Sequence, residues 1–369
     1  PPLSRWLRRH RLPQPCAVGA TGAPRLWPRP APHTCLPWME PAEAEPAGGE
    51  AAPAGEGDGE SVPRTPVVVI VVGMAGSGKT SLMHRLNVHL VETDKRVYYM
   101  NLDPAVQGDT PFSANIDIRD TVNYKEVMRE YGLGPNGGIL TSLNLFATKF
   151  GQVLELLAKR APQLDLVLVD TPGQIEAFTW SASGQIFSEA LAASYPTMLL
   201  YVADTPRCAA EPSTFMSNML YACGMLYRSR LPLVLALNKA DAGPAEEVLS
   251  WMRDFELFQE ALDRQTAGGY MTSLNRSLCL VLDEFYRGLS TVPVSAATGD
   301  GVEELLSATE AGAEEYRSVF LPDLLRRRAE QRSKQEAKTK ADLSRLREDL
   351  GIAAEAPGGA GEGEGSAGA

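Results

Sequence analysis

The stretch Gly73–Thr80, GMAGSGKT, places glycines, a lysine and a hydroxyl at the spacing of a phosphate-binding loop. Glycines let backbone N–H groups curl around phosphate oxygens, and the helix that follows adds partial positive charge at its N-terminus. We expect Lys79 to reach the β- and γ-phosphates, and the hydroxyl of Thr80 to bind Mg²⁺. The residues that we predict to surround the phosphates are Gly73, Ala75, Gly76, Ser77, Gly78, Lys79, Thr80 and Ser81.

Acidic residues follow two other apolar runs. Asp170 ends VLVD, where a carboxylate holds Mg²⁺, and in DTPGQ we expect Gly173 to meet the γ-phosphate and Gln174 to orient water. This pattern alone is weak, because many strand-to-turn junctions show it. Asp103 in NLDPA is either a turn starter before proline or a residue that positions the attacking water or a metal-bound water. The predicted metal set is therefore Thr80, Asp103 and Asp170.

The sequence NKAD predicts which base is bound. The carboxylate of Asp241 can accept two hydrogen bonds from guanine, and adenine offers neither donor. Each hydrogen bond to a charged group is worth roughly 1.5–3 kcal/mol. We expect Asn238 to connect the loops around the nucleotide and the stem of Lys239 to lie over the guanine ring. In the pair Ser295-Ala296, the Ala296 N–H would meet guanine O6. NKAD alone also fits a lysine-capped turn, but after the two earlier motifs it indicates a guanine nucleotide.

The stretch Gly132–Gly138, GLGPNGG, gathers turn-forming residues between two segments that both look helical. Proline fixes φ near −65°, and asparagine tolerates the left-handed region. We therefore predict a stiff turn that presents Asn136 at its tip. The alternative is a helix C-cap followed by a tight turn.

These motifs need a scaffold that brings strand ends together. Short apolar, β-branched runs alternate with segments of helical periodicity, which predicts an α/β fold with a mostly parallel sheet in three layers, as in P-loop NTPases. Ligands then bind beyond the carboxyl ends of the strands, where every motif above lies. The predicted strands are PVVVIVV, RVYYMNL, DLVLVD, TMLLYVAD, PLVLALN and STVPVSA.

We divide the chain into a core domain at 63–318, a charged helical extension at 319–352 and a disordered tail at 353–369. Within the core, 243–290 predicts a helical hairpin, whose apolar stripes are either core packing or a groove for a partner peptide. One stripe is Leu249, Met252, Phe255, Phe258 and Leu262, and the other is Leu274, Leu278, Val281, Phe285 and Leu289.

Residues 1–62 predict a disordered leader. Residues 1–38 hold six arginines and no acid, and 39–62 hold seven acids and no base. Both are rich in Pro, Gly and Ala, so neither can bury enough apolar surface to fold. We expect natural translation to start at Met39; the alternative is an arginine-rich transit peptide.

The net charge of −11 argues against nucleic-acid and anionic-membrane partners. No apolar run approaches the roughly 20 residues of a membrane helix. The five cysteines form no CxxC pair, and the last three read as reduced core thiols of an intracellular protein.

The combination resembles the GPN-loop GTPases over about Val67 to Leu350, and residues 1–62 depart from that family. The residues that carry the resemblance are GMAGSGKT, NLDPA, GLGPNGG, DTPGQIE, NKAD and SA. The resemblance implies a dimer in which Asn136 of one subunit faces the γ-phosphate and attacking water of the other. It also implies that Asp103 joins Asp170 and Gln174 around Mg²⁺ and water, so the predicted catalytic residues are Asp103, Gln174 and Asn136. No arginine finger is evident, and we therefore expect slow hydrolysis.

The resemblance further implies a GTP-driven factor for assembly and nuclear import of RNA polymerase II, cytoplasmic and shuttling to the nucleus. The working form would be a heterodimer with a paralogue or a homodimer. Leu343, Leu346, Leu350 and Ile352 have the spacing of a nuclear export signal, which would engage export machinery; the alternative is the apolar edge of a helix. Two other functions stay open: a scaffold stabilised by bound nucleotide, and a phosphotransferase acting on a small acceptor.

Overall fold

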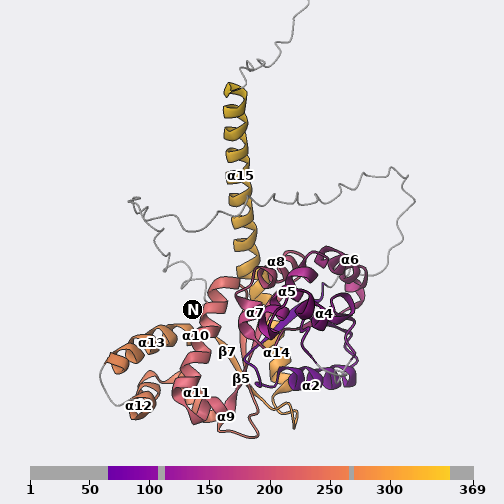
Figure 1. Cartoon of the computed structure of the whole chain (residues 1–369). Helices are drawn as coiled ribbons and strands as arrows, with labels where there is room; N and C mark the ends of the chain where they lie inside the picture. The colour runs from indigo at the N-terminus through magenta and orange to yellow at the C-terminus, as the bar shows by residue number, and fades with distance from the viewer. Residues whose placement is uncertain (1–64, 107–112, 266–269, 350–369) are drawn as a thin grey trace, which may run out of the picture. The chain divides into compact units, whose positions relative to one another are not determined.

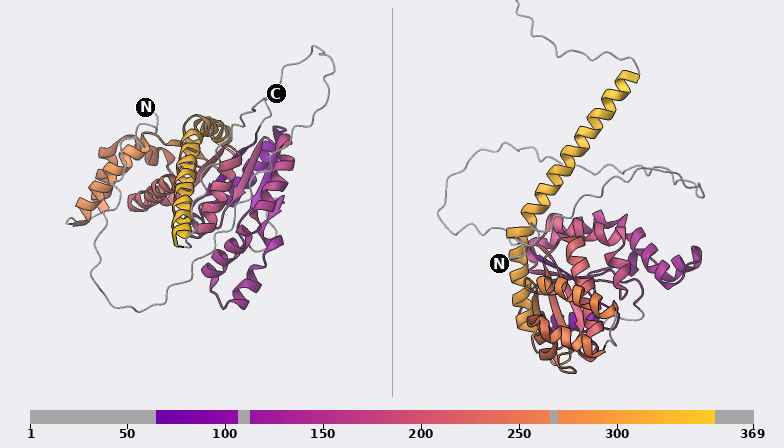
Figure 2. Two further views of the ribbon diagram at one scale, coloured as in Figure 1. Left: turned by 90° about the horizontal axis from the view of Figure 1, so that it is seen from above. Right: turned by 90° about the vertical axis from the view of Figure 1, so that its left-hand side faces the viewer.

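The computed structural model describes residues 65–106, 113–265 and 270–349. Seven parallel strands form one sheet in the order β3-β2-β4-β1-β5-β6-β7, with helices on both faces (Figures 1 and 2). The predicted α/β fold is confirmed, and its mostly parallel sheet is parallel throughout. Its strands are β1 Val67–Val72, β2 Val97–Asn101, β3 Ile116–Asp117, β4 Leu166–Asp170, β5 Thr197–Asp204, β6 Leu233–Asn238 and β7 Ser290–Val294.

All six predicted strands are present within two residues of their expected ends. The sequence analysis missed β3, because a strand of two residues carries no apolar run. It is held by pairing of Ile116 with Met100 and of Asp117 with Asn101. The central strands are almost wholly buried, as expected when helices cover both faces of a parallel sheet.

One face of the sheet is covered by α2, Lys79–Glu92, and α14, Val302–Glu315. Leucines of both helices join the branched side chains of the strands in one core cluster. Because α2 begins directly after the glycine-rich loop, this packing fixes the position of that loop.

The opposite face is covered by α5, Pro135–Ala147, α8, Ala182–Ser194, and α10, Pro212–Ser229. Phe146, Phe150 and Phe187 pack there with ring centroids 4.7–6.2 Å apart. The periodicity of LNLFATKFGQVLELLAKRA predicts one helix over residues 143–161, and this prediction is wrong. The chain breaks at Thr148 and Lys149, so that α5 is followed by a separate α6. The shorter helices between β3 and β6 include α6 Phe150–Arg160, η1 Ala161–Gln163, α7 Ile175–Thr179 and α9 Thr205–Ala210.

The GPN residues begin a helix and are not a free turn. After α3, Ile118–Thr121, and α4, Tyr124–Glu130, Gly134 is the N-cap of α5, and Pro135 and Asn136 are its first residues. Asn136 is not in the left-handed region, so that part of the prediction is wrong. Proline suits the first helical position, because its missing N–H has no partner there.

The insertion after β6 contains three helices, so the predicted two-helix hairpin is wrong. They are α11 Ala245–Arg253, α12 Phe255–Gln265 and α13 Tyr270–Tyr286. Asp254 separates the first two, because its carboxylate accepts hydrogen bonds from the N–H groups that open α12.

Aromatic packing holds the insertion to α10. Phe215 of α10 lies within 6.1 Å, centroid to centroid, of Trp251, Phe258 and Tyr286. The interpretation as core packing is therefore confirmed for Phe258. The predicted stripe of α13 is shifted, because Leu282 is buried whereas Val281 is 49% exposed.

The helices predicted after Glu303 are α14, the π-helical turn η2 Tyr316–Phe320, and α15 Leu321–Asp349. Residues 328–345 of α15 are exposed, as expected for a helix charged on all sides. Of the four residues with the spacing of an export signal, Leu343 is exposed. The side chain of Leu346 and the residues Leu350 and Ile352 lie outside what the structure describes, as do the predicted leader and tail.

Within the described residues, no helix is both long and apolar enough to span a membrane. Cys208, Cys223 and Cys279 are buried free thiols, as predicted.

Candidate nucleotide site

The glycine-rich loop joins the end of β1 to the start of α2. Gly76 and Gly78 have φ of +81° and +89°, a region that L side chains rarely adopt. A Cβ at Gly78 would lie 2.4 Å from Nδ2 of Asn238, so no other residue fits there without a shift. The loop geometry thus requires the glycines that the sequence pattern contains.

Lys79, the first residue of α2, is buried and turns back over the loop. Its Nζ donates hydrogen bonds to the carbonyl oxygens of Gly73, at 2.8 Å, and Met74, at 3.2 Å. Burial lowers the pKa of this ammonium group, and the charges of Asp170 and Asp103 oppose that shift. The lysine is therefore a preorganised cation beside two carboxyl groups.

The two carboxyl groups lie at the ends of neighbouring strands. Asp170 ends β4, and its Oδ1 is buried without a hydrogen-bond partner among the described residues. Burial raises the pKa of Asp170 to about 7, while Lys79 lowers it. Asp103 follows β2; its Oδ1 accepts from Ala105 N at 2.9 Å and its Oδ2 from Gly173 N at 3.3 Å. Burial also raises the pKa of Asp103.

Asn238 connects three loops at the carboxyl ends of β1, β6 and β7. Its Nδ2 donates to the carbonyl oxygens of Ser77, at 2.9 Å, and Gly78, at 3.3 Å. Its Oδ1 accepts from Ala296 N at 3.2 Å. The predicted tie between loops is therefore present. The Ala296 N–H that we expected at guanine O6 has this internal partner instead.

Asp241 lies on the exposed side of the same edge. Its Oδ1 accepts a hydrogen bond from Ser295 Oγ at 2.6 Å, which orients the carboxylate of this exposed residue. Lys239 has φ of +63°, and its Nζ donates to Gly76 O at 2.9 Å and to Asp204 Oδ2 at 2.7 Å. The lysine stem thus spans from NKAD to the phosphate-binding loop.

Two predicted catalytic amides meet within one chain. Gln174 follows β4, and its Nε2 donates to Oδ1 of Asn136 at 2.6 Å. We predicted that Asn136 acts on the partner's nucleotide, and this single chain places it beside its own Gln174. Because Gly173 also donates to Asp103, the loops after β2 and β4 and the start of α5 converge near the phosphate-binding loop.

The family model described as "Conserved hypothetical ATP binding protein" matches residues 71–315. GPN-loop GTPase 1 of Schizosaccharomyces pombe is 52% identical over 296 residues, which cover 78% of this chain and 80% of the relative. GPN-loop GTPase QQT2 of Arabidopsis thaliana is 59% identical over 260 residues, 70% of this chain and 68% of the relative. Among solved structures, the apo form of a GTPase from Pyrococcus abyssi is 29% identical, covers 67% of this chain and 97% of its own, and superposes with a TM-score of 0.58.

The chain belongs to the GPN-loop GTPase family. The predicted resemblance is thereby confirmed, as is the assignment to GTPases. The family model carries the word ATP in its description, whereas the relatives are named GTPases. The chain itself has the NKAD sequence, with Asp241 at the same sheet edge as the phosphate-binding loop.

The predicted site residues of this GTPase lie along the carboxyl edge of the sheet, on both sides of the phosphate-binding loop. The loop from Gly73 to Ser81 lies between the carboxylates of Asp103 and Asp170 on one side and the NKAD and Ser295-Ala296 loops on the other. Thr80 is half-buried and Ser81 exposed, at the second and third positions of α2.

Sequence reasoning missed Asp204 and Arg207, which also reach the loop. Asp204 ends β5, and its ion pairs with Lys239 and Arg207 tie the start of α9 to NKAD. A usable signal was present, since Asp204 ends an apolar run as Asp170 does. Arg207 was missed because Thr205-Pro206-Arg207 after a strand matches none of the nucleotide-binding motifs named above.

The side chains beside Lys79 suit Mg²⁺, which prefers hard oxygen ligands. Oδ1 of Asp170 is buried without a hydrogen-bond partner among the described residues, and burial raises the pKa of this carboxyl group more than Lys79 lowers it. Within the described residues, no three His, Cys, Asp or Glu side chains cluster as a metal site by themselves. This is consistent with Mg²⁺ held by one or two carboxylates together with substrate phosphates.

Proposed function

We propose that this GTPase binds Mg·GTP at the carboxyl edge of its sheet and hydrolyses it slowly, as a dimeric switch. The observation that carries guanine binding is the Asp241 carboxylate, oriented by Ser295 and tied through Asn238 to the phosphate-binding loop. One element therefore connects base selection with phosphate binding, so that a correct base and a bound phosphate chain stabilise the same loop arrangement.

Thr80, Asp170 and Asp103 would hold Mg²⁺, whose charge neutralises developing negative charge on the phosphates when it is bound. Lys79, which lies beside the carboxyl groups of Asp103 and Asp170, contributes a fixed cation at the phosphate-binding loop. Gln174 and Asn136 carry neutral amides, so they orient water without supplying charge. This set favours a slow reaction.

The proposal also covers the dimer and the protein complex on which the GTPase acts. From the family resemblance, we infer that the GTPase pairs with a paralogue or with itself, and that Asn136 then serves the partner's nucleotide. From the same resemblance, we infer a role in assembly and nuclear import of RNA polymerase II, with shuttling between cytoplasm and nucleus. The exposed length of α15 offers a surface for these interactions.

Calorimetry of the full chain with GTP, GDP and ATP, in the presence of Mg²⁺, tests the nucleotide assignment. We expect GTP and GDP to bind and ATP to fail as a competitor. Equal competition by ATP, or no retained nucleotide, would overturn the proposal.

Single-turnover hydrolysis with and without the closest paralogue tests the dimeric mechanism. We expect the paralogue to accelerate hydrolysis, and Asn136→Ala to remove that acceleration. If Gln174→Ala abolishes turnover while the client is still delivered, the chain is a nucleotide-stabilised scaffold and its hydrolysis is incidental.

A further inference from the structure

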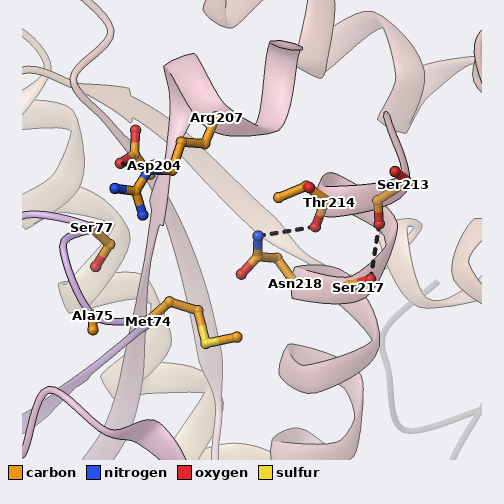
Figure 3. A pocket seen from close by; sticks show the side chains of 9 residues that line it. All are labelled: Met74, Ala75, Ser77, Asp204, Arg207, Ser213, Thr214, Ser217 and Asn218. Atoms are coloured by element: carbon orange, nitrogen blue, oxygen red, sulfur yellow. Dashed lines mark hydrogen bonds and ion pairs between the residues drawn. The ribbon is translucent and has the colours of Figure 1, made fainter. Parts of the chain in front are cut away.

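An arginine that belongs to none of the sequence motifs lies against the phosphate-binding loop. Arg207 is the third residue of α9 and follows the last residue of β5 by three positions. Its Nη1 and Nη2 both lie 3.6 Å from the position that a Cβ on Gly76 would occupy. The guanidinium group therefore faces the middle of the loop, as Figure 3 shows from the side of the adjoining cavity.

A buried carboxylate holds this arginine in place. Nε of Arg207 lies 3.4 Å from Oδ2 of Asp204, whose side chain is only 9% exposed. Asp204 is itself fixed by Lys239 at 2.7 Å. A Cβ on Gly243 would lie 2.9 Å from the backbone of Pro206, so the chain after NKAD packs directly on α9 and restrains it. The guanidinium group of Arg207 is thus held in place by its ion pair with Asp204 and by the packing of Gly243 on α9.

The guanidinium group of Arg207 donates no hydrogen bond to the residues that the structure describes, and its ion pair with Asp204 is made nearest to Nε, at 3.4 Å. Two parallel N–H groups on a planar guanidinium are the arrangement that binds a phosphate through two oxygens. Arg207 also lines a cavity of about 330 Å³ between the loop and α10. Ser77 and Asp204 line the same cavity, and Ser77 Oγ and Asp204 Oδ1 are buried without a hydrogen-bond partner in the described chain.

The position along the loop indicates which phosphates would be contacted. Backbone N–H groups of such a loop surround the α- and β-phosphates, whereas its lysine reaches the β- and γ-phosphates. Arg207 stands beside Gly76, at the middle of the loop, and Lys79 lies at its end. The arginine is therefore placed for the part of the phosphate chain that GDP and GTP share.

We propose that Arg207 is a further nucleotide-binding residue, which clamps the α- and β-phosphates of GDP and GTP and slows nucleotide release. This inference rests on the proposed function at the same site. It assigns Arg207 to binding of the ground state, and Asp204 to positioning it. The proposal differs from an arginine finger, because Arg207 stands beside Gly76 at the middle of the loop and not beside Lys79 at its end.

The test measures the affinity of the full chain for GDP and GTP, together with steady-state hydrolysis. We expect Arg207→Ala to raise Kd about tenfold for both nucleotides, because a hydrogen bond to a charged group is lost at a largely exposed side chain. KM for GTP should rise similarly, while kcat stays within about twofold. Arg207→Lys should recover part of the affinity, since lysine restores the charge but not the paired N–H groups.

Arg287→Ala is the matched control. Its side chain is 68% exposed, against 67% for Arg207, and it too pairs with a carboxylate, at Asp283 on α13. We expect nucleotide affinity unchanged in this variant, and thermal unfolding unchanged in both alanine variants.

Three results would overturn the inference. Wild-type affinity in Arg207→Ala would remove any contact with the nucleotide. A fall in kcat of about a thousandfold at unchanged Kd would make Arg207 a transition-state residue instead. An effect on GTP alone would place it at the γ-phosphate. If the wild-type chain itself binds no guanine nucleotide, the proposed function fails, and that result is distinct from all three.

Discussion

The raised pKa of Asp170 predicts an unusual pH dependence of stability in the GTPase free of Mg²⁺ and nucleotide. Its folded pKa of about 7 lies above the ordinary value of 3.8, mainly because of burial. A carboxyl group with a raised pKa stabilises the fold while it is protonated, and that contribution is lost as pH rises through the folded pKa. Each pKa unit corresponds to about 1.4 kcal/mol, so the full effect on the free energy of unfolding is about 4 kcal/mol.

The variant Asp170→Asn isolates this effect, since the amide keeps the shape but cannot ionise. Between pH 5 and pH 8, the wild type should lose roughly 2–3 kcal/mol of unfolding free energy relative to the variant. Urea unfolding at both pH values, with EDTA and without nucleotide, measures the difference. The other titrating groups largely cancel, because they are common to both chains.

Two results would refute the reasoning. A difference between wild type and variant that is the same at pH 5 and pH 8 would mean that Asp170 is already ionised at pH 5. A wild type that gains stability relative to the variant as pH rises would mean that the carboxylate has a partner in the free protein. With Mg·GDP at saturation, this pH dependence should largely disappear, because the bound metal keeps the carboxylate ionised at both pH values.

Two further predictions concern the base loop. Asn238→Ala removes three hydrogen bonds, one buried and two partly buried, with Ser77, Gly78 and Ala296. Urea unfolding should therefore show a loss of roughly 2–4 kcal/mol, and GDP affinity should fall; a loss below about 1 kcal/mol would show that the three loops hold together without Asn238. Asp241→Asn should raise Kd for GTP at least about tenfold and improve binding of xanthosine triphosphate, since the new amide can donate to the xanthine C2 carbonyl. Calorimetry with both nucleotides measures this, and an unchanged preference for GTP would remove Asp241 from base recognition.

The sequence by itself determined the α/β fold, six of the seven strands that the structure describes, and the motifs GMAGSGKT, DTPGQ, NKAD and SA. It could do so because these depend on local features: short β-branched runs between helical segments, and glycines where the loop needs positive φ. Gly78 illustrates this, since its φ of +89° is one that L side chains rarely adopt.

Only the tertiary structure decided which side chains meet. The contact of Asn136 with Gln174 depends on where α5 starts, and proline before asparagine fits a turn and a first helical turn equally well in sequence. The position of Arg207 at Gly76 depends on β5 pairing directly with β1, and no local pattern encodes the pairing partner of a strand. The pKa of Asp170 likewise follows from burial by strands and loops distant in sequence, so it could not be inferred from the residues around it.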